Sequence, residues 1–297
     1  MRITNRMIAT NMLSTVAKNR DMAAKLQLDI ATTKRVRRPS DDPTGVIQIE
    51  RFKWLISRNE QYVKNITLMN DFMSTSNTAL ESGIDLIEKA KDLAIRGSSD
   101  VLNDEARQSL AIEVDQLIDV MVDIGNTRYG GRYVFGGTLT TGTDPFTRVG
   151  DVITYNGNGK AINGKIGFEA EVTYNKTGVE VFNPAGGPDV FGALVSLKQG
   201  LEANDISAVQ TALVDLTDSM DHLISVSSQV GILQERLSST EIMVENENIS
   251  FADQVSKIQD TDTVEALVNS KILENAINSG LQTMANVLQT SLMDFVS

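Results

Sequence analysis

An apolar repeat with alternating spacings of three and four residues constrains this chain more than any other feature. Between Ile49 and Ala94, 14 positions follow this spacing and ten of them are apolar. Between Ile206 and Ile258, 16 positions follow it and 12 are apolar. A repeat sustained over this length indicates the seam of a coiled coil or a long helical bundle. The second stretch alone, with 53 residues, would form a helix of roughly 80 Å.

Cap residues predict where the helices begin. Asp42 is a good N-cap before the first long repeat, and Pro43 suits the first helical position. Asn103 is the predicted cap of a shorter helix. Asp262 and Glu265 resemble a capping box and predict the start of a last helix.

Glycine divides the chain. Of 21 glycines, 14 lie between Gly130 and Gly192, and nine of the 15 aromatic residues accompany them, counting from Tyr129. Asn-Gly dipeptides at 156–157, 158–159 and 163–164 predict hairpin turns. The runs predicted as strands are Asp151 to Tyr155, Lys165 to Tyr174 and Val179 to Phe182. We therefore expect a β-rich insert between helical flanks.

Both ends of the chain carry an apolar stripe with the same spacing, which predicts terminal helices that bury one face. Residues 1–38 have a net charge of +7 and residues 201–297 a net charge of −12, so pairing of the two ends is favoured. We predict that these stripes form an assembly interface. Its candidate residues are Met12, Val16, Ala23, Leu26, Ile30, Ile277, Leu281, Met284, Leu288, Leu292 and Phe295.

The predicted fold class is mainly α with a β-rich insert. A long antiparallel helical bundle or coiled-coil rod has paired terminal helices and a small β domain inserted in mid-chain. Three domains are expected. Residues 1–38 with 262–297 form a helical terminal domain, residues 39–129 with 193–261 a helical rod, and residues 130–192 the insert. A pair of terminal helices buries too little surface to offset chain entropy, so we expect it to be largely disordered in the monomer.

Composition argues against several classes of function. The net charge of −12 disfavours nucleic acid as a partner. The chain has no cysteine and a single histidine, His222, so we expect no catalytic centre, metal site or cofactor. No apolar run has the length of a membrane span, and the first 13 residues lack the apolar core of a signal peptide. We expect no membrane association.

Three polar segments invite a functional interpretation, and in each a structural one is stronger. The run KRVRRP (34–39) is followed at once by Asp41 and Asp42, which favours a solvated or interfacial loop over a nucleic-acid patch. GNGKAING (157–164) lacks the ending of a phosphate loop and indicates turns. Polar residues in the long seams either fix the helix register or line water-filled notches. Among them are Asn59, Asn70, Asn77, Lys91, Ser227, Gln234 and Asn248.

Several motifs together resemble the flagellin family, and within it the branch that forms the hook–filament junction. The start MRIT and the segment KRVRRPSDDPTG (34–45) are similar to family motifs, with Thr33 where the family commonly has glycine. GGRYVFGG (130–137) with TGTDPF (141–146) resembles the entry to the outer domain, and SLMDFVS (291–297) resembles the branch's C-terminal end. The likeness covers both helical flanks. Residues 151–190 match nothing in the family.

The resemblance implies an axial domain of paired terminal helices, a rod of long helices and a β-rich outer domain. It implies export without cleavage through the flagellar type III apparatus, with a flagellar export chaperone. It also implies a structural adaptor of the flagellum that assembles as a homo-oligomeric ring, with hook-associated protein 1 below and flagellin above.

Other interpretations stay open at this point. The chain could be a flagellin, the bulk subunit of the filament, which polymerises indefinitely where an adaptor adds one layer. A helical receptor or signalling domain would require a ligand pocket and a membrane anchor. An enzyme within the insert is the weakest alternative, because residues 130–192 contain neither histidine nor cysteine.

Overall fold

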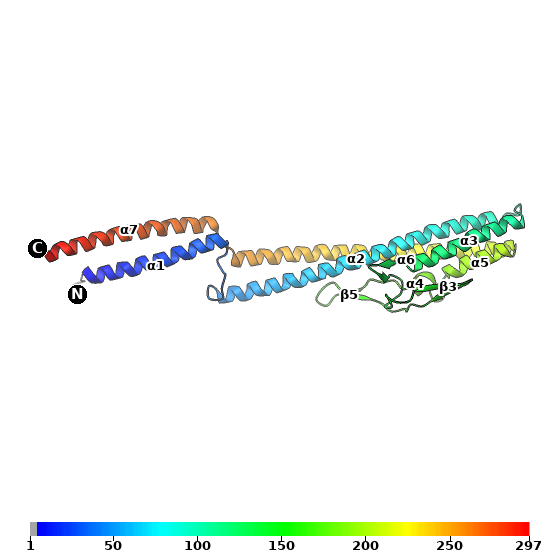
Figure 1. Ribbon diagram of the computed structural model, residues 1–297, viewed down its shortest axis with the longest axis horizontal. Helices are drawn as coiled ribbons and strands as arrows, with labels where there is room; N and C mark the ends of the chain where they lie inside the picture. The colour runs from blue at the N-terminus through cyan, green and yellow to red at the C-terminus, as the bar shows by residue number, and fades with distance from the viewer. Residues whose placement is uncertain (1–4, 297) are drawn as a thin grey trace. The chain divides into compact units, whose positions relative to one another are not determined.

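The computed structural model describes residues 5–296, with the surroundings of side chains given for residue 7 and residues 10–286. Helices dominate the described chain (Figure 1), and small antiparallel strand pairs lie in its middle. The helices are α1 (Asn5–Thr32), α2 (Pro43–Gly97), α3 (Asp104–Gly125), α4 (Gly178–Phe182), α5 (Val190–Glu202), α6 (Ile206–Gln259) and α7 (Thr263–Val296). The strands are β1 (Arg128–Tyr129), β2 (Arg132–Tyr133), β3 (Phe146–Val149), β4 (Val152–Tyr155), β5 (Asn163–Lys165) and β6 (Glu171–Thr173).

The chain divides into two units. One comprises residues 1–57 and 247–297, and the other residues 58–246. In the first unit α1 and α7 pack side by side (Figure 1), which confirms the predicted pairing of the terminal helices. The mainly helical fold with a central β-containing insert is confirmed as well. The division into three domains stays a prediction.

The helices begin where the cap residues predicted. The Asp42 carboxylate accepts a hydrogen bond from the Gly45 N–H at 2.9 Å. The Asn103 side chain accepts one from the Ala106 N–H at 2.9 Å. Asp262 accepts the N–H groups of Val264 and Glu265 at 2.9 and 3.0 Å. Each cap satisfies N–H groups that have no partner inside the helix.

The two long repeats form continuous helices, α2 with 55 residues and α6 with 54. In the second unit their apolar seam positions are buried, as Ile66, Ile87 and Leu223 show with no exposed surface. Two of the polar seam positions meet there, since the Ser227 hydroxyl donates to Asn77 Oδ1 at 2.7 Å. A half-buried polar pair between helices favours one register, because a slipped register separates the two partners.

The insert is built on three short hairpins around an aromatic cluster. β1 pairs with β2 through the turn Gly130–Gly131, where both residues have positive φ as a two-residue hairpin turn demands. β3 pairs with β4, and β5 with β6, all antiparallel. The cluster joins rings whose centroids lie 5.0 to 5.4 Å apart. Its members are Phe135, Phe146, Tyr155, Phe182 and Phe191.

The sequence-based prediction was wrong for parts of the insert. Val179 to Phe182 is not a strand but lies in α4, because Thr177 and Glu180 form a reciprocal capping box at its start. Lys165 to Tyr174 is not one strand but contains a turn between β5 and β6. The Asn-Gly dipeptides do not make the hairpin turns. In the pair at 163–164, Gly164 lies inside β5. A glycine is needed at this position because a Cβ there would overlap the Met69 sulfur.

Candidate assembly interface

The terminal helices hold each other through small and medium-sized residues. Ala23 of α1 is 6% exposed, and Ala266 and Ser270 of α7 are 4% and 5% exposed. Gly280 lies so close that a Cβ there would be 3.0 Å from Val16 Cγ2. This small-residue seam brings the two helices close together, so part of the predicted stripe is covered within one chain.

The candidate interface residues therefore occupy different environments. Ala23 is buried and Leu281 is exposed. Met284 and five others are half-buried. These five are Met12, Val16, Leu26, Ile30 and Ile277. The side chains of Leu288, Leu292 and Phe295 lie outside the described residues.

A second set of apolar side chains is exposed on the same two helices, and the predicted stripe contains only one of its members, Leu281. The others lie outside the stripe positions, although Val264, Val268 and Ile272 follow one another at a helical spacing of four residues. Their exposed fractions run from 49% to 71%, more than a two-helix pair can cover by itself. They are Met7, Leu13, Met22 and Leu28 of α1 and Val264, Leu267, Val268, Ile272 and Leu281 of α7. We call this set the outer apolar face.

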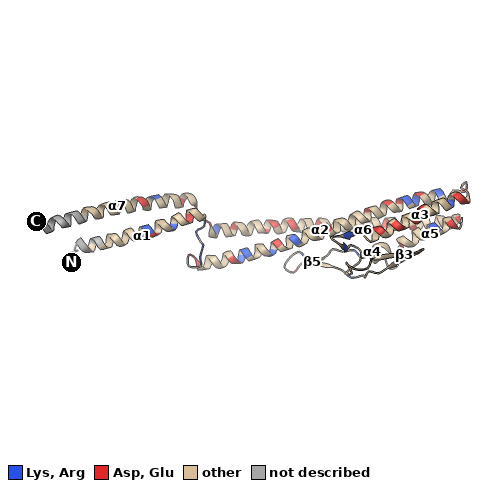
Figure 2. Cartoon of the chain, viewed as in Figure 1, with Lys and Arg blue, Asp and Glu red and all other residues tan. Residues whose placement is uncertain are grey.

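Charge does not hold the terminal helices together. In the described part of the chain the ion pairs of these helices stay local, as Lys271 does with Glu274 at 2.9 Å. None of them joins α1 to α7. Figure 2 shows basic residues on α1 and acidic residues on α7 beside large uncharged stretches. The described seam between the two helices is formed mainly by small and apolar residues.

The connection between α1 and α2 is tied to the connection between α6 and α7. The N–H groups of Arg35 and Val36 both donate to the Gln259 carbonyl, at 2.7 and 3.2 Å, and the Thr261 N–H donates to the Thr33 carbonyl at 3.0 Å. Val36 is buried, with 3% of its surface exposed. We call residues 33–42 with 258–262 the joint. The predicted loop at 34–39 is thus a structural element of this unit.

Charged groups fix the joint from within. The Arg37 guanidinium lies 2.8 Å from Asp29, which is buried near the end of α1. Asp41 accepts the backbone N–H groups of Arg37 and Arg38 at 3.2 and 3.1 Å. Those two hydrogen bonds hold the pKa of the Asp41 carboxyl below its usual value. Asp41 organises the loop while Asp42 caps α2, so each carboxylate has a structural role.

Thr33 strains the joint, because its φ of +56° is a left-handed conformation that favours glycine. We expect Thr33→Gly to raise the free energy of unfolding by roughly 0.5–1 kcal/mol, the relief of strain less the added chain entropy. The neighbouring Thr32→Gly, at the last residue of α1, should lower it by about 0.5 kcal/mol, because glycine adds chain entropy and the hydroxyl bond to the Leu28 carbonyl is lost. Urea unfolding followed by circular dichroism measures both. A destabilised Thr33→Gly protein would show that the threonine conformation is not strained.

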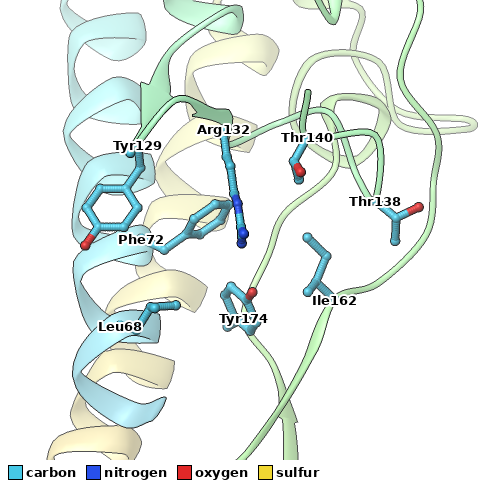
Figure 3. Close-up of a pocket in the computed structure, with 9 residues that line it drawn as sticks. Leu68, Phe72, Tyr129, Arg132, Thr138, Thr140, Ile162 and Tyr174 are labelled. Atoms are coloured by element: carbon cyan, nitrogen blue, oxygen red, sulfur yellow. The ribbon is translucent and has the colours of Figure 1, made fainter. Parts of the chain in front are cut away.

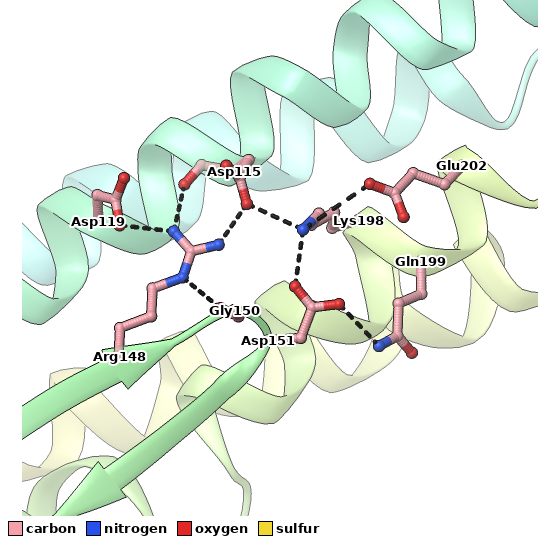
Figure 4. Close-up of polar contacts among 8 residues, drawn as sticks. All are labelled: Asp115, Asp119, Arg148, Gly150, Asp151, Lys198, Gln199 and Glu202. Atoms are coloured by element: carbon pink, nitrogen blue, oxygen red, sulfur yellow. Dashed lines mark hydrogen bonds and ion pairs between the residues drawn. The ribbon is translucent and has the colours of Figure 1, made fainter.

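A network of ion pairs binds the β3–β4 hairpin to α3 and α5 in the second unit (Figure 4). Arg148 of β3 pairs with Asp115 and, at 2.6 Å, with Asp119 of α3. Lys198 of α5 lies 3.0 Å from Asp115 and 2.7 Å from Asp151 in the hairpin turn. The ammonium of Lys198 lowers the pKa of both carboxyls, with help from Arg148 at Asp115 and from Gln199 at Asp151.

Lys198→Met should lower the free energy of unfolding at pH 7 by roughly 1–2 kcal/mol, an estimate reduced for the partial exposure of both carboxylates. A carboxyl with a lowered pKa stabilises the fold above its unfolded-state pKa and loses that effect as the pH falls through the folded-state pKa. The deficit of the variant should therefore shrink below about pH 4, near the ordinary Asp pKa. Urea unfolding at pH 7 and pH 3 measures it, with the exposed Lys89→Met as control. An equal deficit at both pH values would contradict this role.

A cleft of about 430 Å³ lies between α2 and the insert (Figure 3). Phe72, Tyr129 and Tyr174 form an aromatic wall, and Arg132 extends into the space between them and Ile162. His222 lies elsewhere and bonds the Glu180 carbonyl at 2.9 Å. In the part of the chain that the structure describes, no three carboxylate or imidazole side chains gather as metal ligands. None of the described helices has the length and apolar character that a membrane crossing requires.

Paired terminal helices with an outer apolar face, continued by long helices, define the class of helical structural subunits. The model of the bacterial flagellin N-terminal helical region matches residues 3–140. The model of the bacterial flagellin C-terminal helical region matches residues 213–296. The chain belongs to the flagellin family.

The chain is similar to two kinds of flagellar protein. It is 22% identical to flagellar hook-associated protein 3 of Salmonella typhimurium over 98% of both chains. It is also 22% identical to flagellin of Listeria innocua over 88% of this chain and 87% of that one. Among solved structures, hook-associated protein 3 from Legionella pneumophila has the same fold. Its TM-score is 0.63 at 16% identity, over 71% of this chain and 98% of that chain.

Proposed function

We propose that this protein is a structural adaptor of the bacterial flagellum at the hook–filament junction. The observation that carries the proposal is the similarity to flagellar hook-associated protein 3 along nearly the whole chain, in Salmonella typhimurium and, at 24% identity over 92% of both chains, in Escherichia coli. The outer apolar face supports an assembly role. The protein works by contact, and its chemistry is burial of side chains rather than catalysis.

In the proposed assembly, copies of the chain form a ring between hook-associated protein 1 and flagellin. The outer apolar face of each terminal pair is covered by neighbouring subunits. Burial of one Leu-sized side chain stabilises by roughly 1.5–3 kcal/mol, so nine such residues can offset the cost of ordering the ends. The chain reaches this place by type III export with its flagellar chaperone and without cleavage.

Immunogold electron microscopy tests the proposal. An epitope inserted between Gly186 and Gly187, in an exposed loop of the insert, keeps both helical units intact. We expect gold at the distal tip of the hook. Cells without the gene should assemble hooks and release flagellin into the medium. Attached filaments of normal length in the deletion strain would refute the adaptor role.

A bulk filament subunit is the second candidate, because the chain is also similar to a flagellin along most of its length. The two candidates differ in copy number. Gold along the whole filament, and growth of long filaments from purified protein added to seeds, would favour the flagellin role over the adaptor.

A further inference from the structure

We propose that neighbouring copies of the chain contact each other through the insert, where the β5–β6 tip of one copy enters the aromatic cleft of the next. The tip presents Phe168 and Glu169, and the cleft presents an aromatic wall with Arg132. This inference rests on the proposed assembly of copies at the junction, and it adds which surfaces of the insert meet.

The cleft has the composition of a binding site for an apolar group that carries a carboxylate. Phe72, Tyr129 and Tyr174 supply three aromatic rings, with Phe72 edge-on to both tyrosines at centroid distances of 6.2 and 5.3 Å. Arg132 stands directly opposite Tyr129 in the β1–β2 ladder, so both side chains lie on one face of that hairpin. Figure 3 shows the guanidinium extending into the cleft.

Arg132 has no partner of its own. Within the described residues it makes no ion pair and no side-chain hydrogen bond, although the chain carries 39 acidic residues against 27 basic ones. The adjacent Arg128, in contrast, pairs with Asp144 at 3.2 Å and stacks on Tyr133. A guanidinium binds a carboxylate through two parallel hydrogen bonds, a bidentate ion pair. Partial enclosure by aromatic rings strengthens this ion pair.

The β5–β6 tip offers the complementary groups. Phe168 is 71% exposed, an unusual position for a phenylalanine. The next residue, Glu169, is exposed and has no ion-pair or hydrogen-bond partner among the described residues. The Arg58 guanidinium lies 5.0 Å from the Phe168 ring centroid and supports the tip from the α2 side. Both the Phe168 ring and the Glu169 carboxylate are thus exposed at the tip.

The tip of one chain cannot reach the cleft of the same chain. Ile162 and Tyr174, which line the cleft, flank the base of the β5–β6 hairpin, and Phe168 is six residues from each. Six extended residues span about 20 Å. Along α2, Arg58 by the tip and Phe72 in the cleft are 14 residues apart, or about 21 Å. Tip and cleft are therefore offset along α2, so the tip does not fill the cleft of its own chain, whereas the exposed tip of a second copy can enter it.

A contact of this kind is head-to-tail, because each copy uses its tip on one neighbour and its cleft on the other. Such contacts repeat around a closed ring or along an open helix. An aromatic anchor in a pocket with a desolvated charge pair is the usual composition of an energetic centre in an interface. The insert would then fix the lateral spacing of subunits.

Site-directed cross-linking tests the contact, because the chain has no cysteine and any introduced pair is unique. Thr138→Cys places a thiol at the cleft, and Ala170→Cys places one at the tip while Phe168, Glu169 and Arg132 stay in place. The two single variants are co-expressed as the only copies, and isolated flagella are treated with a short bismaleimide. We expect dimers of the two variants. The double variant on one chain should give a ladder of multimers.

Two controls decide between the outcomes. Glu105→Cys, exposed at the start of α3, replaces Thr138→Cys and should give no dimer above background. Arg132→Glu or Glu169→Arg alone should reduce cross-linking about tenfold, and the two together should restore it. Cross-linking that is absent, or that is unaffected by Arg132→Glu, would overturn the inference. Gold at the hook tip without the cross-link would refute only this contact, whereas gold elsewhere would refute the proposed function.

Discussion

Val268→Asp is expected to abolish attachment of filaments while leaving the isolated protein unchanged. Val268 is 54% exposed on the outer apolar face, so the monomer tolerates a carboxylate there within about 0.5 kcal/mol. In the assembly the same carboxylate would be buried without a partner, which costs roughly 3–5 kcal/mol for each subunit. Motility and electron microscopy measure attachment, and thermal unfolding of purified protein measures stability.

Two matched variants make this result interpretable. Asn278→Asp introduces the same group at an exposed position of α7 that is already polar, and attachment should persist. Ala23→Asp places it in the buried seam between α1 and α7 and should weaken the pairing of the two helices within one chain. Normal filaments on cells that carry Val268→Asp would show that the outer apolar face is not covered by neighbours.

Phe182→Ala is expected to destabilise the second unit by about 3–5 kcal/mol, the usual cost of removing a large aromatic side chain from a packed core. Phe182 is 1% exposed and touches the rings of Phe135, Phe146 and Phe191. The substitution removes the ring at the centre of the aromatic cluster. It leaves a cavity that the surrounding hairpins do not fill by moving inward. The midpoint and slope of urea unfolding measure the effect.

Phe168→Ala is the matched control, because it removes the same side chain from the same insert at an exposed position. Its free energy of unfolding should stay within about 0.5 kcal/mol of the parent. If both variants lost equal stability, the tip of β5–β6 would belong to the core, and the contact between copies proposed above would lose its support.

The helical part of this fold could be predicted from sequence because periodicity and caps act locally. Asn103 and Asp42 indicate helix starts because their side chains accept hydrogen bonds from backbone N–H groups only three residues away. The insert was harder to predict. Gly164 looks like a turn residue, but its role is set by Met69, nearly a hundred residues earlier. The helix that contains Val181 depends on a capping box in a segment rich in β-branched and aromatic residues.

The candidate interface shows the same limit of sequence reasoning. The stripe that includes Val16 and Ala23 predicted which residues bury surface, but not whether a helix of the same chain or another molecule covers them. That distinction depends on the pairing of α1 with α7, which only the three-dimensional structure shows. Most of the outer apolar face lies outside that stripe, as Val268 and Leu267 do, so the stripe did not identify these residues.

The joint has a consequence for the order of events during synthesis. Arg35 donates to the Ile258 carbonyl across 223 positions of the chain, and within the described residues α7 is the helix on which α1 mainly packs. A ribosome builds the polypeptide from its amino end, so α1 has no lasting partner until nearly nine-tenths of the polypeptide exists. The amino-terminal segment therefore stays available to a receptor or carrier until α7 emerges, and the residues of the joint are all synthesised before α7.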